Sequence, residues 1–439
     1  MHVFFSGIGG AGIGSLAEVA HDAGYVVSGS DLHESLVSLE LERRGIDIVY
    51  EQSTESIAAE QAANPIDWLV YSSALPNNAP ELVFARDNNI RISKRDEFLA
   101  EFIKEHDLKL IAVAGTHGKT TTTAMLVWCF KQLNLPISYS IGSTISFGAS
   151  GQFNKDSEYF VYEADEYDRN FLAYKPEVSL ITSLDYDHAD IYPTQEDYDD
   201  AFREFLADSK KSCMWEQAAR QLFGDPKQTP IGVEVLYPPL VDLYNFQLAG
   251  RKMRENAAIA LPSLITILRD FDVEELSPKL VNVLNSFPGT ARRFEKVSEN
   301  LYSDYAHAPA EIAATMEKAR EIANKSGQKV VAVYQPHQNL RQTEIVKEGG
   351  YSVSFDDADK IYWVPTYLVR GDLVYGAPEV LTPDDLIRTL SQEAQENAKP
   401  KELNENLWLE IQKHLAANDL VVVMGAGPID AWLREQLTK

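Results

Sequence analysis

The loop between residues 115 and 120 carries residue types suited to phosphate chemistry. Gly115-Thr116-His117-Gly118-Lys119-Thr120 follows the apolar run Leu108–Ala114 and precedes a helical pattern through Leu133. At such a junction, amides cradle phosphates, an ammonium group offsets their charge, and a hydroxyl can ligate Mg²⁺. The loop is shorter than the common GxxxxGK[ST] pattern, but the residue types keep their order. The ATP-binding residues expected here are Gly115, Thr116, Gly118, Lys119, Thr120 and Thr121.

Acidic residues follow two further strand-like runs. Glu163-Ala164-Asp165-Glu166 comes after Tyr159–Tyr162, and Asp185-Tyr186-Asp187-His188 comes after Val178–Thr182. The carboxyl ends of parallel strands meet at one edge of a sheet, where ligands bind. Magnesium prefers hard oxygen ligands. We therefore expect Thr120, Glu163 and His188 to surround the metal, although a histidine without this context would more often be structural.

A second glycine-rich turn lies at the start of the sequence. Gly7-Ile8-Gly9-Gly10-Ala11-Gly12 separates the strand pattern His2–Ser6 from the helical run Ser15–Ala23, and Asp31 comes near the end of the next strand. Glycines let backbone amides approach a diphosphate at a helix N-terminus. The turn predicts a nucleotide or sugar-diphosphate site. Taken alone it would suggest a nicotinamide dehydrogenase, or a tight turn without a ligand.

Three successive α/β segments are expected to position these loops. The chain has 439 residues, which corresponds to about three domains of average size. The expected domains are residues 1–107, 108–297 and 298–439. In the third, strands are predicted at Leu301–Asp304, Lys329–Tyr334 and Asp419–Met424, with a helix at Ala310–Asn324. The stretch 209–248 is poorly periodic and predicts little regular structure.

Composition excludes several classes of protein. Apolar residues make up 45% and charged residues 24%, as in soluble globular proteins. The formal charge of −26 opposes binding to nucleic acid, although it also simply favours solubility. No apolar stretch approaches the length of a membrane helix. Two isolated cysteines, Cys129 and Cys213, and an N-terminus without a basic region predict a cytoplasmic protein with reduced thiols.

Seven segments together resemble the Mur ligase family. They are, in order, GIGGAGIG, AGTHGKTTT, EADEYDRNFL, ITSLDYDHADIY, GTARRFE, DYAHAP and MGAGPID. The resemblance implies an α/β protein with three domains: an N-terminal Rossmann-like domain, a central P-loop ATPase-like domain and a C-terminal Rossmann-like α/β domain. It also implies an ATP-dependent ligase of peptidoglycan precursor synthesis. Such a ligase joins L-alanine to the carboxylate of UDP-N-acetylmuramate through an acyl phosphate.

The resemblance also implies roles for particular residues. The first domain would bind the UDP-sugar, the second MgATP, and the third the amino acid. Arg293 matches an arginine at the nucleotide phosphates, Asp304 an aspartate near the ribose, and His307 a histidine near the amino acid. Asn256 matches an asparagine near adenine. The implied UDP-sugar and substrate contacts are Gly9, Gly10, Ala11, Gly12, Asp31, Ser72 and His337, and the implied catalytic set is Lys119, Glu163, His188, His307 and Arg341.

The sequence departs from the family pattern at several points. Lys252 and Met253 replace a His-Asn pair, which removes an amide that could pair with adenine. Ala308 replaces a histidine, and Gln338 replaces an arginine three residues before Arg341. The segment before Gly250 is shorter than usual. Some Mur ligases carry a carbamylated lysine that bridges two magnesium ions, and its positional candidates here are Lys210 and Lys211.

These departures leave other functions open. The chain could ligate another amino acid or a murein tripeptide. It could also be a catalytically weakened, UDP-sugar-binding partner of another ligase. The leading expectation remains a ligase that uses ATP and Mg²⁺, acts on UDP-N-acetylmuramate and L-alanine, and is a monomer or weak homodimer.

Overall fold

The chain forms two compact units. The computed structural model describes residues 1–72, 75–188, 191–268, 273–369, 372 and 378–439. One unit holds residues 1–246 and 255–288, and the other holds residues 247–254 and 289–439. Within the described ranges, no helix is long and apolar enough to cross a membrane.

The first unit begins with a five-stranded parallel sheet of order β3-β2-β1-β4-β5. This order is that of a Rossmann-like sheet, with the switch point between β1 and β4. Every residue of β1 is buried, as expected for a strand covered on both faces. The strands are β1 (His2–Ser6), β2 (Val26–Ser30), β3 (Asp47–Val49), β4 (Trp68–Tyr71) and β5 (Arg91–Lys94). The helices are α1 (Ala11–Asp22), α2 (Leu36–Arg43), α3 (Thr54–Ala63), α4 (Pro80–Asp87) and α5 (Arg95–Glu105).

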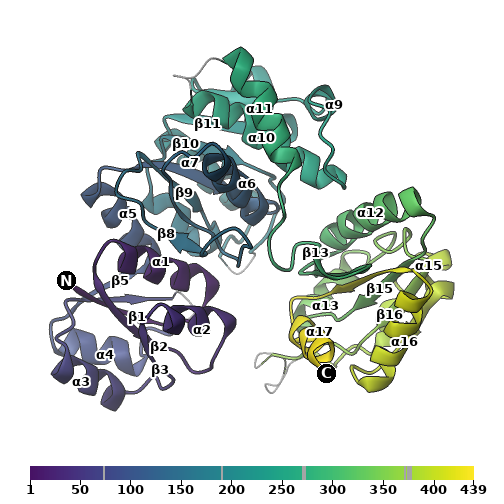
Figure 1. Ribbon diagram of the computed structural model, residues 1–439, viewed down its shortest axis with the longest axis horizontal. Helices are drawn as coiled ribbons and strands as arrows, with labels where there is room; N and C mark the ends of the chain where they lie inside the picture. The colour runs from purple at the N-terminus through teal and green to yellow at the C-terminus, as the bar shows by residue number, and fades with distance from the viewer. Residues whose placement is uncertain (73–74, 189–190, 269–272, 370–371, 373–377) are drawn as a thin grey trace. The chain divides into compact units, whose positions relative to one another are not determined.

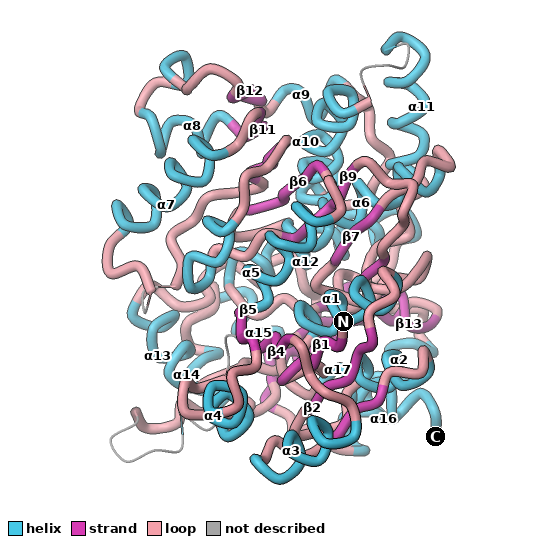
Figure 2. Tube along the Cα trace, turned by 90° about the vertical axis from the view of Figure 1, so that its left-hand side faces the viewer, coloured by secondary structure: helices cyan, strands magenta, loops and turns pink. Residues whose placement is uncertain are grey.

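A second sheet in the same unit has the order β12-β11-β10-β6-β9-β7-β8 and is parallel except for β8. Figure 2 shows β6, β9 and β7 side by side. The strands are β6 (Lys109–Ala114), β7 (Ser138–Ser140), β8 (Gly151–Gln152), β9 (Tyr159–Glu163), β10 (Val178–Ile181), β11 (Lys211–Trp215) and β12 (Val233–Leu236). The helices are α6 (Lys119–Gln132), α7 (Gln195–Asp208), α8 (Glu216–Phe223), α9 (Pro239–Leu243), α10 (Arg251–Ile267) and α11 (Val273–Asn285), with 3₁₀ turns at Tyr167–Ala173 and Pro226–Gln228.

The two sheets of the first unit share one hydrophobic core. Phe98 and Phe102 of α5 belong to the same buried cluster as Tyr162 of β9. Polar contacts also join α1 to the β7–β8 hairpin. The Ser15 hydroxyl lies 2.7 Å from that of Ser140, and the Gly151 amide donates to Glu18 over 2.6 Å. A Cβ on Gly151 would lie 1.8 Å from the carbonyl oxygen of Ser15, so only glycine fits there.

The second unit is built on one six-stranded sheet of order β13-β14-β18-β15-β16-β17. All neighbours are parallel except β13 and β14. Helix α12 covers one face of this sheet, and α16 and α17 cover the other (Figure 1). Its strands are β13 (Glu295–Ser298), β14 (Leu301–Asp304), β15 (Val330–Tyr334), β16 (Lys360–Trp363), β17 (Ala398–Pro400) and β18 (Leu420–Met424). Its helices are α12 (Pro309–Ser326), α13 (Asn339–Lys347), α14 (Pro383–Ile387), α15 (Gln392–Asn397), α16 (Glu405–Ala416) and α17 (Ile429–Thr438).

The predicted α/β architecture of three Rossmann-like and P-loop-like sheets is confirmed. Three details differ from the sequence-based expectation. The boundary expected at residue 297 falls inside β13, which pairs with β14 and so belongs to the third sheet. The stretch 209–248 contains β11, α8, β12 and α9, elements too short for periodicity to reveal. Helix α1 begins at Ala11, because Gly10 is its N-cap.

Candidate active site

Lys119 begins α6, directly after β6, and its ammonium group is enclosed by acceptors. Nζ donates to the carbonyl oxygen of Gly115 over 2.6 Å and to both carboxylate oxygens of Glu166 over 2.9 Å. The Glu166 side chain is 1% exposed and that of Lys119 16%. Burial lowers the pKa of Lys119, but Glu166, Asp165 and Glu163 outweigh it and raise the pKa above its usual value. The ammonium group is therefore a fixed positive charge at the P-loop.

The loop backbone is shaped by close contacts that only glycine allows. Gly118 has φ +90° and forms the N-cap of α6, and a Cβ there would lie 2.6 Å from Oδ1 of Asn256. Gly115 has φ +125°, and its Cβ would lie 2.6 Å from the Ser183 carbonyl oxygen after β10. Thr116 is also tied to that segment, since its hydroxyl donates to the Asp185 carbonyl oxygen over 2.7 Å. The P-loop is thus held between the segment after β10 and α10, with Asn256 of α10 beside Gly118.

Thr120 and Glu163, two of the three residues expected around a magnesium ion, lie next to each other. The Thr120 hydroxyl donates to Oε1 of Glu163 over 2.8 Å, and the Gly142 amide donates to Oε2 over 3.0 Å. Thr121, one residue further along α6, is buried. Both donors are hard oxygens, so their chemistry fits Mg²⁺, which keeps several water or phosphate ligands of its own.

His188 lies beside Glu166, the residue that pairs with Lys119. Its Nε2 lies 3.6 Å from Oε1 of Glu166, and its backbone is in the left-handed region with φ +58°. Burial lowers the pKa of His188, but Glu166 and Asp187 outweigh it, so the pKa is raised. In the described part of the chain, no group of three His, Cys, Asp or Glu residues could hold a metal by itself. A metal here would therefore depend on ligands supplied by substrate and water.

The first glycine-rich turn is organised by two charged side chains. The Gly9 amide donates to Oδ2 of Asp31 over 2.8 Å. A Cβ on Gly12 would lie 2.3 Å from Nη1 of Arg95. Ser72 follows β4, close to Gly7, at the switch point of the sheet. Gly10 and Ala11 begin α1 without a side-chain cap, so this helix N-terminus suits an anion.

In the second unit, the predicted residues gather where β14, β15 and β18 end. Asp304 is buried, and its two carboxylate oxygens accept from the amides of Phe294 (2.6 Å) and Ala306 (2.7 Å). Burial raises the pKa of Asp304, and Arg293 partly offsets this. The Arg293 guanidinium lies over the Tyr305 ring at 5.2 Å.

Two histidines lie at the same edge of the third sheet. Nδ1 of His307 lies 3.2 Å from Oε2 of Glu311. The ring of His337 stacks on Tyr367 at 5.7 Å, and burial together with His307 lowers the pKa of His337. Arg341, on α13, lies 2.9 Å from Oε2 of Glu344. His307 and His337 are thus neighbours, whereas Arg341 forms an ion pair on its own helix.

Sequence reasoning did not single out Glu166, although it lies in the acidic run after β9, or Arg95, which begins α5. Glu166 stands three residues after Glu163 in the same acidic run. Lys210 and Lys211, by contrast, do not reach the P-loop. Lys211 begins β11 at the amino end of the sheet, and Nζ of Lys210 binds Glu177 over 2.6 Å. Lys119, Glu163 and His188 lie at or beyond the carboxyl ends of β6, β9 and β10, so the two lysines lie at the opposite edge of this sheet.

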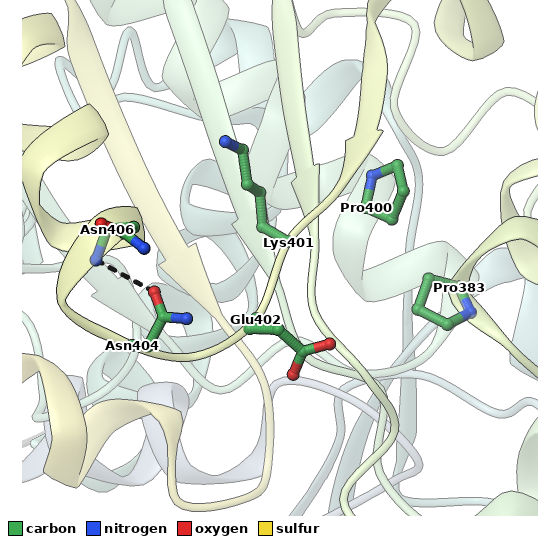
Figure 3. A pocket seen from close by; sticks show the side chains of 6 residues that line it. All are labelled: Pro383, Pro400, Lys401, Glu402, Asn404 and Asn406. Atoms are coloured by element: carbon green, nitrogen blue, oxygen red, sulfur yellow. Dashed lines mark hydrogen bonds between the residues drawn. The ribbon is translucent and has the colours of Figure 1, made fainter.

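One surface hollow lies away from these residues. It has a volume of about 290 Å³ and lies beside the edge strand β17. Figure 3 shows its lining side chains, none of them a predicted site residue; they are Pro383, Pro400, Lys401, Glu402, Asn404 and Asn406.

The glycine-rich loops after β1 and β6 are typical of Rossmann-like and P-loop nucleotide-binding enzymes, and comparisons identify the family. The model of the Mur ligase family catalytic domain matches residues 2–107. The Mur ligase middle domain matches residues 113–219, and the Mur ligase glutamate ligase domain matches residues 292–427.

Relatives match over the whole length of the chain. The UDP-N-acetylmuramate–L-alanine ligase of Rickettsia bellii is 30% identical over 474 residues, covering 99% of this chain and 95% of that protein. The enzyme of the same name from Rickettsia felis is 29% identical over 476 residues, with 99% and 95% covered. The chain belongs to the Mur ligase family.

Solved structures share the fold. A UDP-N-acetylmuramate-alanine ligase from Thermotoga maritima gives a TM-score of 0.74 at 23% identity, with 100% of both chains covered. A murein peptide ligase from Psychrobacter arcticus gives a TM-score of 0.66 at 22% identity, with 100% of this chain and 98% of that chain covered.

Proposed function

We propose that this protein is an ATP-dependent ligase that joins L-alanine to the carboxylate of UDP-N-acetylmuramate in peptidoglycan precursor synthesis. The names of the full-length relatives from Rickettsia support the reaction and its substrates. The observation that carries the proposal is the buried Lys119–Glu166 pair next to Thr120 and Glu163. This arrangement places a cation and two oxygen donors at the start of α6, where ATP phosphates would bind.

The chemistry needs an activated carboxylate, because a free carboxylate is a poor electrophile. A carboxylate oxygen attacks the γ-phosphorus, the bond to the β-phosphate oxygen breaks, and ADP leaves. The alanine amine then attacks the acyl carbon of the acyl phosphate. Inorganic phosphate departs with the electron pair of the broken C–O bond, and the amine loses a proton. Catalysis of such transfers rests on positioning and charge neutralisation.

The residues of the P-loop would supply both the positioning and the charge neutralisation. Lys119 would donate to the β- and γ-phosphate oxygens in place of Glu166, and the loop amides from Gly115 to Gly118 would cradle the phosphates. Thr120 and Glu163 would hold Mg²⁺, and His188 would contact a water molecule bound to the metal. When bound, the metal would neutralise charge on the transferred phosphoryl group.

We assign the remaining substrate contacts to the other two sheets. The turn Gly9–Gly12, with Asp31 and Ser72, would bind the UDP-sugar. Asp304 and Arg293 would bind the nucleotide, while His307, His337 and Arg341 would lie near the amino-acid substrate. The domains of the proposal are residues 1–107, 108–288 and 289–439, the last boundary being moved to include β13 in the third sheet.

The proposal includes a cytoplasmic location and a monomer or weak homodimer. Both cysteines are free and buried, and burial raises the pKa of the Cys213 thiol to about 12. Unreactive reduced thiols are typical of cytoplasmic proteins. Size-exclusion chromatography with light scattering would test the oligomeric state, and a stable higher oligomer would contradict this part.

The test is phosphate release by the purified protein with ATP, Mg²⁺, UDP-N-acetylmuramate and an amino acid. We expect release only when all are present, and faster turnover with L-alanine than with glycine, L-serine or the murein tripeptide. K119A should abolish release. Faster turnover with another acceptor would move the chain to a different Mur ligase activity. Binding of the UDP-sugar without any release would instead indicate a binding partner of another ligase.

A further inference from the structure

Arg95, the first residue of α5, lies against the first turn of α1. A Cβ on Gly12 would lie 2.3 Å from its Nη1 atom. Gly12 is a helical residue, so its backbone does not by itself require glycine. The position of the guanidinium therefore explains why a side chain is excluded at residue 12.

The other edge of the same guanidinium is held by two carboxylates. Nη2 of Arg95 donates to Oδ2 of Asp165 over 2.6 Å, and Nε lies 3.3 Å from Oδ2 of Asp96. Asp96 is fixed in turn, because its Oδ1 accepts from the hydroxyls of Tyr162 (2.9 Å) and Tyr174 (2.7 Å). These contacts form a polar network from the start of α5 to the segment after β9, and Nη1 of Arg95 abuts Gly12 of α1 without a hydrogen bond being part of that contact.

This network ends at the ATP site. Asp165 lies between Glu163, the partner of Thr120, and Glu166, the partner of Lys119. The side chains of Arg95, Asp96 and Asp165 are 17%, 3% and 33% exposed, so the contact with Asp96 is shielded from water and the contact with Asp165 is partly shielded. Two carboxylates already compensate the charge of Arg95, and it therefore adds little attraction for an anion. Its planar fork instead fixes distances, which the single ammonium of a lysine cannot do.

We propose that Arg95 is a positioning residue, which holds the glycine turn at the start of α1 at a fixed distance from the Glu163–Glu166 segment. The proposal rests on the proposed function, in which the turn binds the UDP-sugar and the segment serves ATP. In that case Arg95 sets the distance between the acceptor carboxylate and the γ-phosphate. Misplacement by about 1 Å can cost a factor of about 100 in rate, so the effect belongs mainly to kcat.

The first experiment compares R95K with wild type by phosphate release. R95K keeps the charge but loses the fork. We expect kcat to fall by a factor of about 10 to 100, while the KM for ATP changes by less than about threefold, because Lys119 and Thr120 are untouched. R43K is the matched control, since Arg43 pairs with Glu40 on the exposed face of α2, and its kinetics should equal those of wild type.

The second experiment probes the same contact from α1. G12A should lower kcat about tenfold or more in the wild-type background, because the new Cβ collides with the guanidinium. In the R95K background the lysine can move away, so the same substitution should cost less than about threefold. Calorimetry with UDP-N-acetylmuramate and with ATP measures the binding of each ligand to every variant.

The outcomes are distinguishable. Equal kcat for R95K and wild type would overturn the inference and leave the proposed function intact. An equal cost of G12A in both backgrounds would also overturn it, because glycine would then be needed by the ligand itself. Failure of R95K to fold leaves G12A decisive: an unchanged kcat in G12A would overturn the inference. Wild-type protein that binds neither substrate would overturn the proposed function, and this inference with it.

Discussion

Replacing Glu166 by glutamine (E166Q) removes the negative charge that compensates the ammonium group of Lys119. In the structure both carboxylate oxygens accept from Nζ, and the glutamate side chain is almost fully buried. A glutamine has the same shape but can accept only one of the two hydrogen bonds and carries no charge. Breaking a buried ion pair typically costs 3–5 kcal/mol, and the retained hydrogen bond reduces this, so we expect a loss of about 3 kcal/mol in unfolding free energy.

The nucleotide should respond in the opposite direction. In wild type, the ATP phosphates must displace Glu166 from Lys119, whereas in E166Q the ammonium group is available at no such cost. If about 2 kcal/mol of the lost stability returns on binding, ATP should bind E166Q roughly 30-fold more tightly than wild type. Urea unfolding followed by circular dichroism measures the stability, and calorimetry measures the affinity for ATP with Mg²⁺.

A matched control separates this effect from charge removal in general. Glu204 forms an ion pair with Arg169 in which both side chains are about half exposed. E204Q should change the unfolding free energy by less than about 0.5 kcal/mol and leave the ATP affinity unchanged. Weaker ATP binding by E166Q would refute the reasoning, because it would mean that Glu166 helps to hold the nucleotide or its metal.

Three further predictions concern the metal and a buried lysine. T120V should lower phosphate release by a factor of about 100 and weaken the response to Mg²⁺, because it leaves Glu163 without its hydroxyl partner, whereas T120S should stay within about tenfold of wild type. Removing Mg²⁺ with a chelator should abolish phosphate release but leave calorimetric UDP-sugar binding unchanged, and loss of that binding would contradict a metal confined to Thr120 and Glu163. Burial lowers the pKa of Lys318 from 10.5 to about 8, and Asp304 and Glu321 only partly offset this. Below pH 8 the lysine is charged in both the folded and the unfolded chain, so burying the charged ammonium group lowers the free energy of unfolding by about 3 kcal/mol. Above pH 10.5 the lysine is neutral in both states, and this loss of stability vanishes. K318M should therefore be more stable than wild type at pH 7 in urea unfolding, and the difference should shrink as the pH rises from 8 to 10.5; a difference independent of pH would contradict this account.

Apolar pattern was sufficient to predict the strands that carry the site. β1 and β14 run over the residues expected from the sequence, because each is a short, mostly buried run that ends in a polar or glycine-rich segment. The phosphate loop was predictable for the same reason: its glycines and Lys119 stand at a strand–helix junction. Pattern could not reveal β12, in which only Leu236 is buried, or α9, whose five residues are too few to show a helical period.

Contacts between distant segments were not predictable from local pattern. Glu166 and Glu163 are both acidic residues after one strand, and nothing local indicates which of them meets Lys119 and which meets Thr120. Arg95 reads as an ordinary helix start, and its role depends on the packing of α5 between two sheets. Lys210 precedes β11 and Lys211 is its first residue, so both lie at the amino end of the strand, away from the site.

The contact of α1 with the β7–β8 hairpin limits how the first sheet could be exchanged between relatives. Gly151 admits no side chain because Ser15 occupies the space, and Glu18 depends on the Gly151 amide. A replacement sugar-binding segment would need a serine-sized residue and an acceptor on the matching turns of its own helix, together with an aromatic pair to fill the core beside Phe153. Recombination at residue 107 would otherwise leave the buried Gly151 amide and the Ser140 hydroxyl without the partners they have here. With the UDP-sugar bound at the first glycine turn, as proposed, a new sugar specificity is therefore more accessible through substitutions in that turn than through exchange of the whole segment.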